Sequence, residues 1–281
     1  VICPKGTGAL LADIPDSAST GGNKRGANAV DLQTVRNNAA QVASGNISFV
    51  AGSNNTASAT YATAIGYANT ASGQSAFAGG NNNNATGANA VAFGNENTAS
   101  GDYNSTVSGG YQNTASGRSS WIPGGWQATT RGLLAAWAYA SGQRAAQGDA
   151  QAIGQPVRAT TSSTSAASLT ADAGAVSSSN VMVLPNNSAL LVVAEVVAYS
   201  PGAADAGAWE VRALVKRGAN AASTAVVGSV SVTTIAADAG IGSPTLAIVA
   251  NTTQGAAVVQ ITPADSDTTY VVGNVRCVQV A

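Results

Sequence analysis

Small apolar residues alternate with polar ones through the middle of the chain in blocks of 14 residues, which begin at Gly45, Ala59, Gly73, Gly87 and Gly101. In the first four blocks, the fourth and sixth positions are small residues, mostly alanine, the eighth is glycine, the eleventh asparagine and the thirteenth alanine. Alternation is the period of a strand, and a fixed repeat indicates stacked units that contact only their neighbours. The pattern predicts a parallel β-roll with two short strands per block, joined by Asn- and Gly-rich turns.

The inward positions of this repeat are too small to hold one chain's coil together. Alanine and serine bury little apolar area, and about 25 cal/mol per Å² does not offset an ordering cost of about 1.5 kcal/mol per residue. The larger residues of the blocks, Phe49, Ile65, Phe77, Val91 and Phe93, therefore need a partner surface. We expect copies of the chain to associate along the repeat.

A second hydrophobic pattern precedes the repeat. Leu32, Val35, Ala39 and Val42 follow one another at spacings of three, four and three, with Asp31 ahead of them. This stripe is typical of a short coiled-coil helix with an acidic N-cap. We predict a connecting segment over residues 1–30, a helix over 31–44 and a β-roll shaft over 45–155.

Residues 156–281 change to longer alternating segments with turn signals between them. Short strands at this spacing predict an antiparallel β-sandwich, jelly-roll-like, as a C-terminal knob. The expected strands are Asn180–Leu184, Ala189–Ser200, Ala208–Arg217, Ala225–Ile235, Thr245–Ala250, Ala256–Thr262 and Thr268–Val280. The second of these segments is apolar on both faces, which fits either an interface between copies or an inner strand.

The composition narrows the function classes. Only 9% of the 281 residues are charged and the formal net charge is −1, so there is no basic face to neutralise the phosphates of a nucleic acid. No apolar run is long enough for a membrane-spanning helix. A surface of Asn, Ser, Thr and Gln favours an extracellular or virion protein.

Little conventional catalytic chemistry is available. The chain has no histidine, which excludes His-dependent triads and His-ligated metals. The carboxylate pairs Asp13/Asp16 and Asp265/Asp267 lie in turn-like sequence next to proline, where aspartate normally forms turns. The Gly-rich segment 21–26 lacks the ending of a phosphate-binding loop. We predict no catalytic residues, no metal and no cofactor.

The two cysteines lie near opposite ends of the chain. Cys3 and Cys277 have no CxxC spacing, so they indicate neither a disulfide framework nor a zinc site. Cys277 alternates with Val271, Gly273 and Val275, and we expect it to be a small core residue.

Several segments carry a resemblance to known families. The block Ala62–Gly73, Ala-Thr-Ala-Ile-Gly-Tyr-Ala-Asn-Thr-Ala-Ser-Gly, resembles the head repeat of trimeric autotransporter adhesins of the YadA type. The segments Pro4–Ala9 and Gly26–Asp31, the Asn-rich repeats, and the C-terminal segments Leu184–Ala189 and Arg217–Ala225 more closely resemble bacteriophage tail fibres. The resemblance implies a homotrimer with a left-handed parallel β-roll.

The expected function is that of a non-enzymatic phage tail-fibre protein in the virion. Its N-terminal side would contact other tail or baseplate proteins, and its knob would bind a polysaccharide or protein receptor on the bacterial surface, without membrane insertion. Three alternatives stay open: a tail-spike depolymerase acting on surface polysaccharide, a structural fibre attached to the capsid, and the head of a bacterial trimeric adhesin.

Candidate receptor-binding residues fall in two places. Aromatic residues gather where the repeat loosens beyond Gly101, and they fit either a platform for sugar rings or a wider core. Polar residues occupy predicted loops of the knob, where recognition commonly varies. The candidates are Tyr103, Tyr111, Trp121, Trp126 and Trp137, followed by Asp205, Asn220, Asp238, Asp265 and Asp267.

Overall fold

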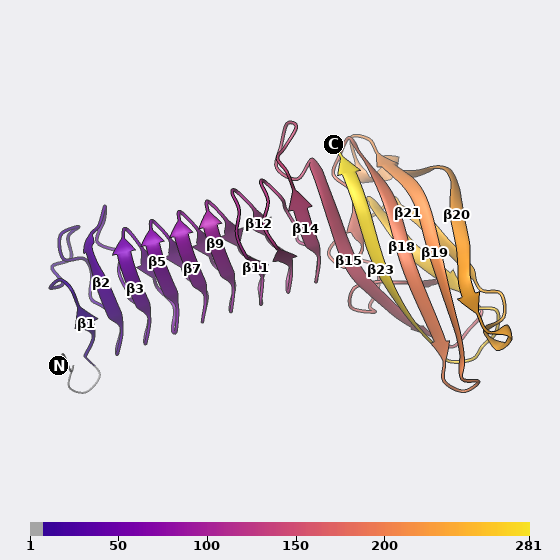
Figure 1. Ribbon diagram of the computed structural model, residues 1–281, viewed down its shortest axis with the longest axis horizontal. Helices are drawn as coiled ribbons and strands as arrows, with labels where there is room; N and C mark the ends of the chain where they lie inside the picture. Colours follow the sequence, from indigo (N-terminus) through magenta and orange to yellow (C-terminus); the bar gives the residue numbers. More distant parts are fainter. Residues whose placement is uncertain (1–7) are drawn as a thin grey trace. The chain divides into compact units, whose positions relative to one another are not determined.

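A computed structural model describes residues 8–281 of the chain (Figure 1), so Cys3 and most of the Pro4–Ala9 segment lie outside the described residues. The chain forms two compact units, the first ending at Gly132 and the second running from Leu133 to Ala281. The described part is built from β-strands, with two short 3-10 turns and no α-helix.

The first unit is a parallel β-solenoid in which each turn supplies one longer and one shorter strand. The longer strands form one parallel ladder and the shorter strands a second. The longer ladder contains β1 (Leu10–Leu11), β2 (Val30–Val35), β3 (Phe49–Ser53), β5 (Thr63–Tyr67), β7 (Phe77–Asn81), β9 (Val91–Asn95), β11 (Thr106–Val107) and β13 (Trp121–Ile122). The shorter ladder contains β4 (Thr56–Ala57), β6 (Thr70–Ala71), β8 (Asn84–Ala85), β10 (Thr98–Ala99) and β12 (Thr114–Ala115).

The register of this solenoid follows the 14-residue repeat. Ala64 pairs with Ala78 and Ala78 with Ala92, and all three side chains are fully buried. Ile65 and Phe93 face outward and are 39% exposed. The prediction of two strands per block with small residues inside is confirmed.

A column of buried asparagines joins the turns. The Oδ1 atom of Asn69 accepts from the backbone N–H and the side-chain amide of Asn83, at 2.9 and 3.0 Å. The Nδ2 atom of Asn83 also donates to the carbonyls of Gly79 and Gly94, at 2.9 and 2.7 Å. The same pattern recurs at Asn55, Asn97 and Asn113. Because each buried amide is satisfied, the column is a connected network and not a set of desolvated polar groups.

Glycine at the eighth position of a block is required by close approach between turns. Gly66 has a φ of +113°, and a Cβ atom there would lie 2.2 Å from the carbonyl oxygen of Gly80. An L-residue at this position is excluded by its backbone angle and by this contact.

The predicted helix over residues 31–44 is wrong. Residues 30–35 form β2, which pairs in parallel with β3. Leu32 and Val35 are three residues apart, which would put them on opposite faces of a regular strand, but the pairing with β3 shifts register between Gln33 and Val35. The two side chains are therefore both exposed, at 48% and 58%. The inward positions are Asp31 and Gln33, both fully buried. Burial of these two polar side chains requires hydrogen-bonding partners, which other residues of the chain supply.

The second unit contains a six-stranded antiparallel sheet in the order β14-β15-β23-β18-β19-β20 (Figure 1). Its strands are β14 (Trp137–Ala140), β15 (Ala150–Thr161), β18 (Ser188–Ser200), β19 (Asp205–Arg217), β20 (Ala225–Ala237) and β23 (Thr269–Val280). A smaller antiparallel sheet contains β16 (Ala167–Ser168), β17 (Met182–Val183), β21 (Thr245–Asn251) and β22 (Ala256–Thr262). The 3-10 turns are η1 (Ala221–Ser223) and η2 (Ala239–Ile241).

The core of the second unit lies on one face of the large sheet. Alternate residues of its central strands are almost completely buried, among them Leu190, Val211 and Val275. Leu169, just after β16, packs near Gly273 on the same side. Cys277 is 3% exposed on that face, which confirms the prediction that it is a core residue.

Candidate functional site

The last solenoid turns carry a group of exposed aromatic side chains, here called the aromatic patch: Tyr103, Tyr111, Trp121 and Trp126. The register of the strand pairing gives the position of each of these side chains along the solenoid. Trp121 pairs with Thr106 at the start of the longer strand, and Tyr111 bridges to Trp126 at its other end. Tyr103 bridges to Ala88 just before the longer strand begins. The patch therefore lies along the side of the solenoid formed by the longer ladder.

These aromatic side chains are not core filling. Tyr103, Trp121 and Trp126 are 51%, 50% and 48% exposed, and Tyr111 is 36% exposed. The interior of the same turns is filled by Val107, Ala115 and Ile122, which are fully buried. Of the two interpretations that the sequence left open, burial in a wider core is excluded for these four residues.

Polar groups border Tyr111 and Trp126. Their ring centroids are 6.4 Å apart at an angle of 37°. The next residue in each turn is a glutamine: Gln127 Nε2 donates to Gln112 Oε1 at 2.9 Å, and Gln112 Nε2 donates to Glu96 Oε2 at 2.7 Å. Two tilted rings thus stand beside a fixed row of amide and carboxylate groups.

The other members of the patch also have fixed polar neighbours. The Arg118 guanidinium lies 5.4 Å from the centre of the Tyr103 ring, within the range of a cation–π contact. Trp121 Nε1 donates to Ser108 Oγ at 2.9 Å. Flat apolar faces next to hydrogen-bonding groups suit ligands that are apolar on one face and polar at the rim.

Trp137 does not belong to this patch. It lies on β14 of the second unit and is only partly exposed. Its indole covers Gly154, where a Cβ atom would lie 2.4 Å from Nε1. The Trp137 side chain therefore packs on the neighbouring strand β15.

Three of the predicted knob residues gather at one end of the second unit. Asp238 Oδ2 accepts from the backbone N–H of Ala206 at 3.0 Å. Asp205 lies against Gly240: a Cβ atom added to Gly240 would lie 1.9 Å from Asp205 Oδ2. Asp265 lines a cavity of about 10 Å³ together with Gly240, a space for one water molecule and not for a sugar.

The remaining two candidates are local turn formers. Asp267 is exposed, and its backbone N–H donates to Asp265 Oδ1 at 3.0 Å. Asn220 caps η1 by accepting from the Ser223 N–H. Asn220 lies at the end of β19 opposite to Asp205, because the chain reaches it after Arg217, which pairs with Ser188. The structure therefore does not bring the five knob candidates into one site.

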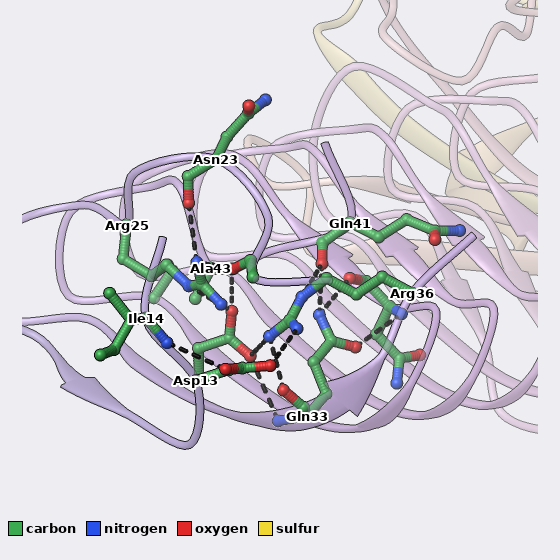
Figure 2. Close-up of polar contacts among 12 residues, drawn as sticks. Asp13, Ile14, Asn23, Arg25, Gln33, Arg36, Gln41 and Ala43 are labelled. Atoms are coloured by element: carbon green, nitrogen blue, oxygen red, sulfur yellow. Dashed lines mark hydrogen bonds and ion pairs between the residues drawn. The ribbon is translucent and has the colours of Figure 1, made fainter. Parts of the chain in front are cut away.

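A buried charge cluster in the first solenoid turn was missed by the sequence reasoning (Figure 2). Arg25 Nε lies 2.7 Å from Asp31 Oδ2, and Arg36 Nη2 lies 3.3 Å from Asp31 Oδ1. Arg36 also approaches Asp13, at 3.8 Å. The side chains of Arg25, Asp31 and Arg36 are at most 1% exposed. The cluster is inaccessible to ligands, so its role is to close the polar interior of this turn.

Within residues 8–281 no three of His, Cys, Asp and Glu stand close enough together to hold a metal ion. The same residues contain no helix with the length and hydropathy of a membrane span.

The comparisons with known proteins give distant structural likenesses. No protein-family model and no curated protein matches the sequence. Among solved structures, the tailspike protein gp49 of Acinetobacter baumannii bacteriophage Fri1, a capsular polysaccharide depolymerase, is similar over 83% of this chain and 47% of its own, with 9% identity and a TM-score of 0.27. The tailspike protein of Acinetobacter baumannii phage AM24 is similar over 97% and 52%, with 9% identity and a TM-score of 0.25. The chain spans about half the length of these two proteins.

Both neighbours are phage tailspike proteins. The comparison corrects the prediction of a non-enzymatic protein, because the gp49 neighbour is a capsular polysaccharide depolymerase.

Proposed function

We propose that this chain is part of a phage tail spike that binds a surface polysaccharide of its bacterial host through the aromatic patch. The observation that carries the proposal is the exposure of Tyr103, Tyr111, Trp121 and Trp126 on a rigid solenoid, beside fixed amide groups. Aromatic rings combine a large apolar face with a defined orientation, and exposed ones mark interaction surfaces. Sugar rings match this chemistry, with an apolar face and hydroxyl groups at the rim.

The low charge of the chain supports the same ligand class. With 9% charged residues and a net charge of −1, the chain offers little long-range attraction for a highly charged partner. Several identical patches in an assembly would bind a repeating polymer more tightly than one patch does. In this proposal the chain forms a homotrimer, and the second unit is the β-sandwich knob at the C-terminal side.

Polysaccharide cleavage is the second candidate function, because the gp49 tailspike is a capsular polysaccharide depolymerase. Glycoside hydrolysis generally needs two carboxyl groups about 5–9 Å apart across the scissile bond. Release of new reducing ends on incubation with a bound polysaccharide would assign the chain to the spikes that act on their receptor.

The binding proposal is tested with Trp126→Ala. Wild-type protein is screened against bacterial capsular and lipopolysaccharide fragments, and the affinity for the best ligand is measured by titration calorimetry. Removing one ring of the Tyr111/Trp126 pair is expected to weaken binding by about tenfold or more.

The matched control is Tyr67→Ala. Tyr67 belongs to the same side of the solenoid and is 51% exposed, but it lies on β5, outside the patch. We expect its loss to leave the affinity unchanged. The proposal fails if wild-type protein binds no fragment, or if both variants weaken binding equally.

A further inference from the structure

The side of the large sheet opposite the core, here called the outward face, carries more positive than negative charge. Alternate residues of each strand point to this side, and the charged ones within the described residues are four cations and two carboxylates: Arg158, Arg212, Lys216 and Arg276, with Glu195 and Glu210. Arg158 and Lys216 are exposed and form no ion pair with any described residue. The chain as a whole has a net charge of −1, so the positive excess is a property of this face.

The strand register puts an aromatic ring and two guanidinium groups in one row across the face. Val193 of β18 pairs with Arg276 of β23 and with Arg212 of β19. Because neighbouring strands are about 4.8 Å apart, the Cα atoms of the two arginines are about 10 Å apart. On the other side of Arg276 the row continues through Gly154 to Trp137.

The two unpaired cations lie on either side of this row along the strands. Arg158 pairs with Val272, four residues before Arg276 on β23. Lys216 lies four residues after Arg212 on β19, in the opposite direction along the sheet because the two strands run antiparallel to the strand between them. At about 3.4 Å per residue, each is about 14 Å from the row. The positive charges therefore follow a diagonal line across the face.

The side chains of the row also line a groove of about 300 Å³, at the lower end of the usual size of a small-ligand site. Leu191 and Val278 give the groove an apolar lining, and Arg212 and Arg276 give it a charged one. Trp137 adds a flat ring. A purely apolar ligand would cover the guanidinium groups without a hydrogen-bonding partner, which is unfavourable. The groove therefore suits a ligand with one apolar side and an acidic group.

The two arginines keep donors available for such a group. Arg212 Nη2 lies 2.8 Å from Glu210 Oε1, and Arg276 Nη2 contacts Glu195 Oε1. A guanidinium has five N–H donors in a planar fork, and these contacts engage one nitrogen of each. The Arg212 and Arg276 side chains are 58% and 48% exposed, so donors remain open to solvent. A carboxylate can accept two parallel N–H bonds from such a fork.

We infer that the outward face binds a saccharide that carries a carboxylate, such as a uronic acid or a sialic acid. The carboxylate contacts Arg212 or Arg276, and the apolar side of the sugar ring lies in the groove beside Trp137. Arg158 and Lys216 extend the site to further acidic units of the same polymer. The attraction acts at contact distance, because a net charge of −1 provides little at long range.

This inference rests on the proposed polysaccharide ligand and adds two things to it. It places a second site in the second unit, away from the residues of the aromatic patch, and it gives the polymer an acidic sugar. The two sites can be tested separately, because they share no residue.

The probes are oligosaccharides with uronic or sialic acid units from bacterial capsules, and the same oligosaccharides after their carboxyl groups have been reduced to alcohols. Affinities are measured by titration calorimetry. Wild-type protein is expected to bind at least one acidic probe, and to bind its reduced form about tenfold more weakly or less, since charge-assisted hydrogen bonds are lost. Added salt should weaken the binding of the acidic probe and not that of the reduced one.

Two substitutions change the affinity in opposite directions. Arg276→Gln should weaken binding of the acidic probe by about tenfold, because it removes a guanidinium and leaves Glu195 without its partner. Glu195→Gln should strengthen binding by about threefold or more, because it removes a carboxylate that competes for Arg276. A gain in affinity cannot result from unfolding. Lys24→Gln, at an exposed lysine of the first unit, changes the net charge as Arg276→Gln does and should have no effect.

Trp126→Ala separates this site from the aromatic patch. The preference for the acidic over the reduced probe should be the same in Trp126→Ala as in wild-type protein. If Trp126→Ala abolishes binding of every probe, the aromatic patch is the whole site and this inference fails while the proposed function stands. If Trp126→Ala binds every probe as wild type does and Arg276→Gln does not, the proposed patch fails and the outward face stands.

Three further results would overturn the inference. One is equal binding of acidic and reduced probes, and the second is wild-type affinity in Arg276→Gln. The third is a lower mass of Arg276→Gln by light scattering with probe binding unchanged, because the face would then be a contact between copies of the chain.

Discussion

The two units of this chain are both all-β, but they satisfy their interiors in different ways. The solenoid interior holds alanines and a connected column of asparagines, from Asn55 to Asn113. The second unit buries larger apolar side chains such as Leu190, Ile248 and Ile261. Hydrogen bonds between turns therefore define the first unit, and apolar packing on one face of a sheet defines the second.

Because of this difference, the two units are sensitive to different kinds of substitution. A repeat whose turns contact only their neighbours depends on every polar group finding its partner in the next turn. A sheet with an apolar core tolerates polar changes at its surface but leaves apolar area exposed where the core ends. Substitutions in each unit test this difference between the two interiors, and the largest effect is expected in the first solenoid turn.

Asp31→Asn is expected to be the most damaging change in the solenoid. It keeps the shape of the side chain but removes the negative charge between Arg25 and Arg36, both of them buried. Breaking a buried ion pair by neutralising one partner typically costs about 3–5 kcal/mol. Hydrogen exchange over residues 29–57 measures the local free energy of opening.

Asp102→Asn is the control for this change, because Asp102 is an exposed aspartate of the same unit. Its effect should stay within about 0.5 kcal/mol. An Asp31→Asn protein with wild-type exchange would show that the cluster is not needed to close the first turn.

Asn83→Ala tests the asparagine column. It removes the side-chain donor to the Gly79 and Gly94 carbonyls and the acceptor for the Asn97 N–H, at 3.0 Å. Buried groups left without partners cost about 1–3 kcal/mol each, and entry of water recovers part of this. We expect a loss of about 3 kcal/mol, read by hydrogen exchange over residues 69–97.

The neighbouring Asn81→Ala serves as its control. Asn81 is exposed on β7, so its truncation should change the opening free energy by less than about 0.5 kcal/mol. Equal losses in the two variants would mean that the buried column contributes nothing special to the stacking of turns.

The solenoid could be predicted well from the sequence because the same residue types recur in each block. Alanine, glycine and asparagine return at the same positions of each block, so the two ladders and the inward alanines follow from the pattern. The partners of the asparagines did not follow, since a turn-forming role explains Asn83 equally well from sequence alone.

The first turn was mispredicted for a physical reason. Leu32 and Val35 have the spacing of a helical stripe and not of a regular strand, and both are exposed only because the strand pairing shifts register between Gln33 and Val35. Asp31 and Gln33 face inward, which is favourable only because Arg25 and Arg36 pair with Asp31. The Gln33 side chain donates to the carbonyls of Gln41 and Asn55. Burial of the charge cluster is a tertiary effect that periodicity does not encode.

The candidate site was predicted in part. The aromatic residues were identified from their clustering beyond Gly101, but their exposure was left open, because a tryptophan at a strand position fits a core or a surface. The knob aspartates were chosen from loop position alone. The structure shows that Asp238 accepts from the backbone N–H of Ala206 on β19, and that the N–H of Asp267 donates to Asp265 within one turn.

The smallest expected effect lies in the second unit and concerns pH. The backbone N–H of Gly174 donates to the carboxylate of Asp172 at 3.0 Å, and Asn180 and Thr170 add side-chain hydrogen bonds. The Gly174 hydrogen bond, supported by the other two against a smaller effect of burial, lowers the pKa of Asp172 below its ordinary value of 3.8. Its contribution to stability is therefore present above about pH 3.8 and is lost as the pH falls through the lowered pKa.

Asp172→Asn should remove this dependence. At pH 6 we expect its melting temperature to be slightly below that of the wild-type protein, because a neutral amide accepts these hydrogen bonds less strongly. The gap should narrow as the pH is lowered toward 2, since the wild-type carboxylate then becomes protonated. Thermal unfolding followed by circular dichroism from pH 6 to pH 2 measures it. A difference in melting temperature that stays constant with pH would show that Asp172 acts through its shape and not its charge. Apolar packing would then be the main source of stability in this unit.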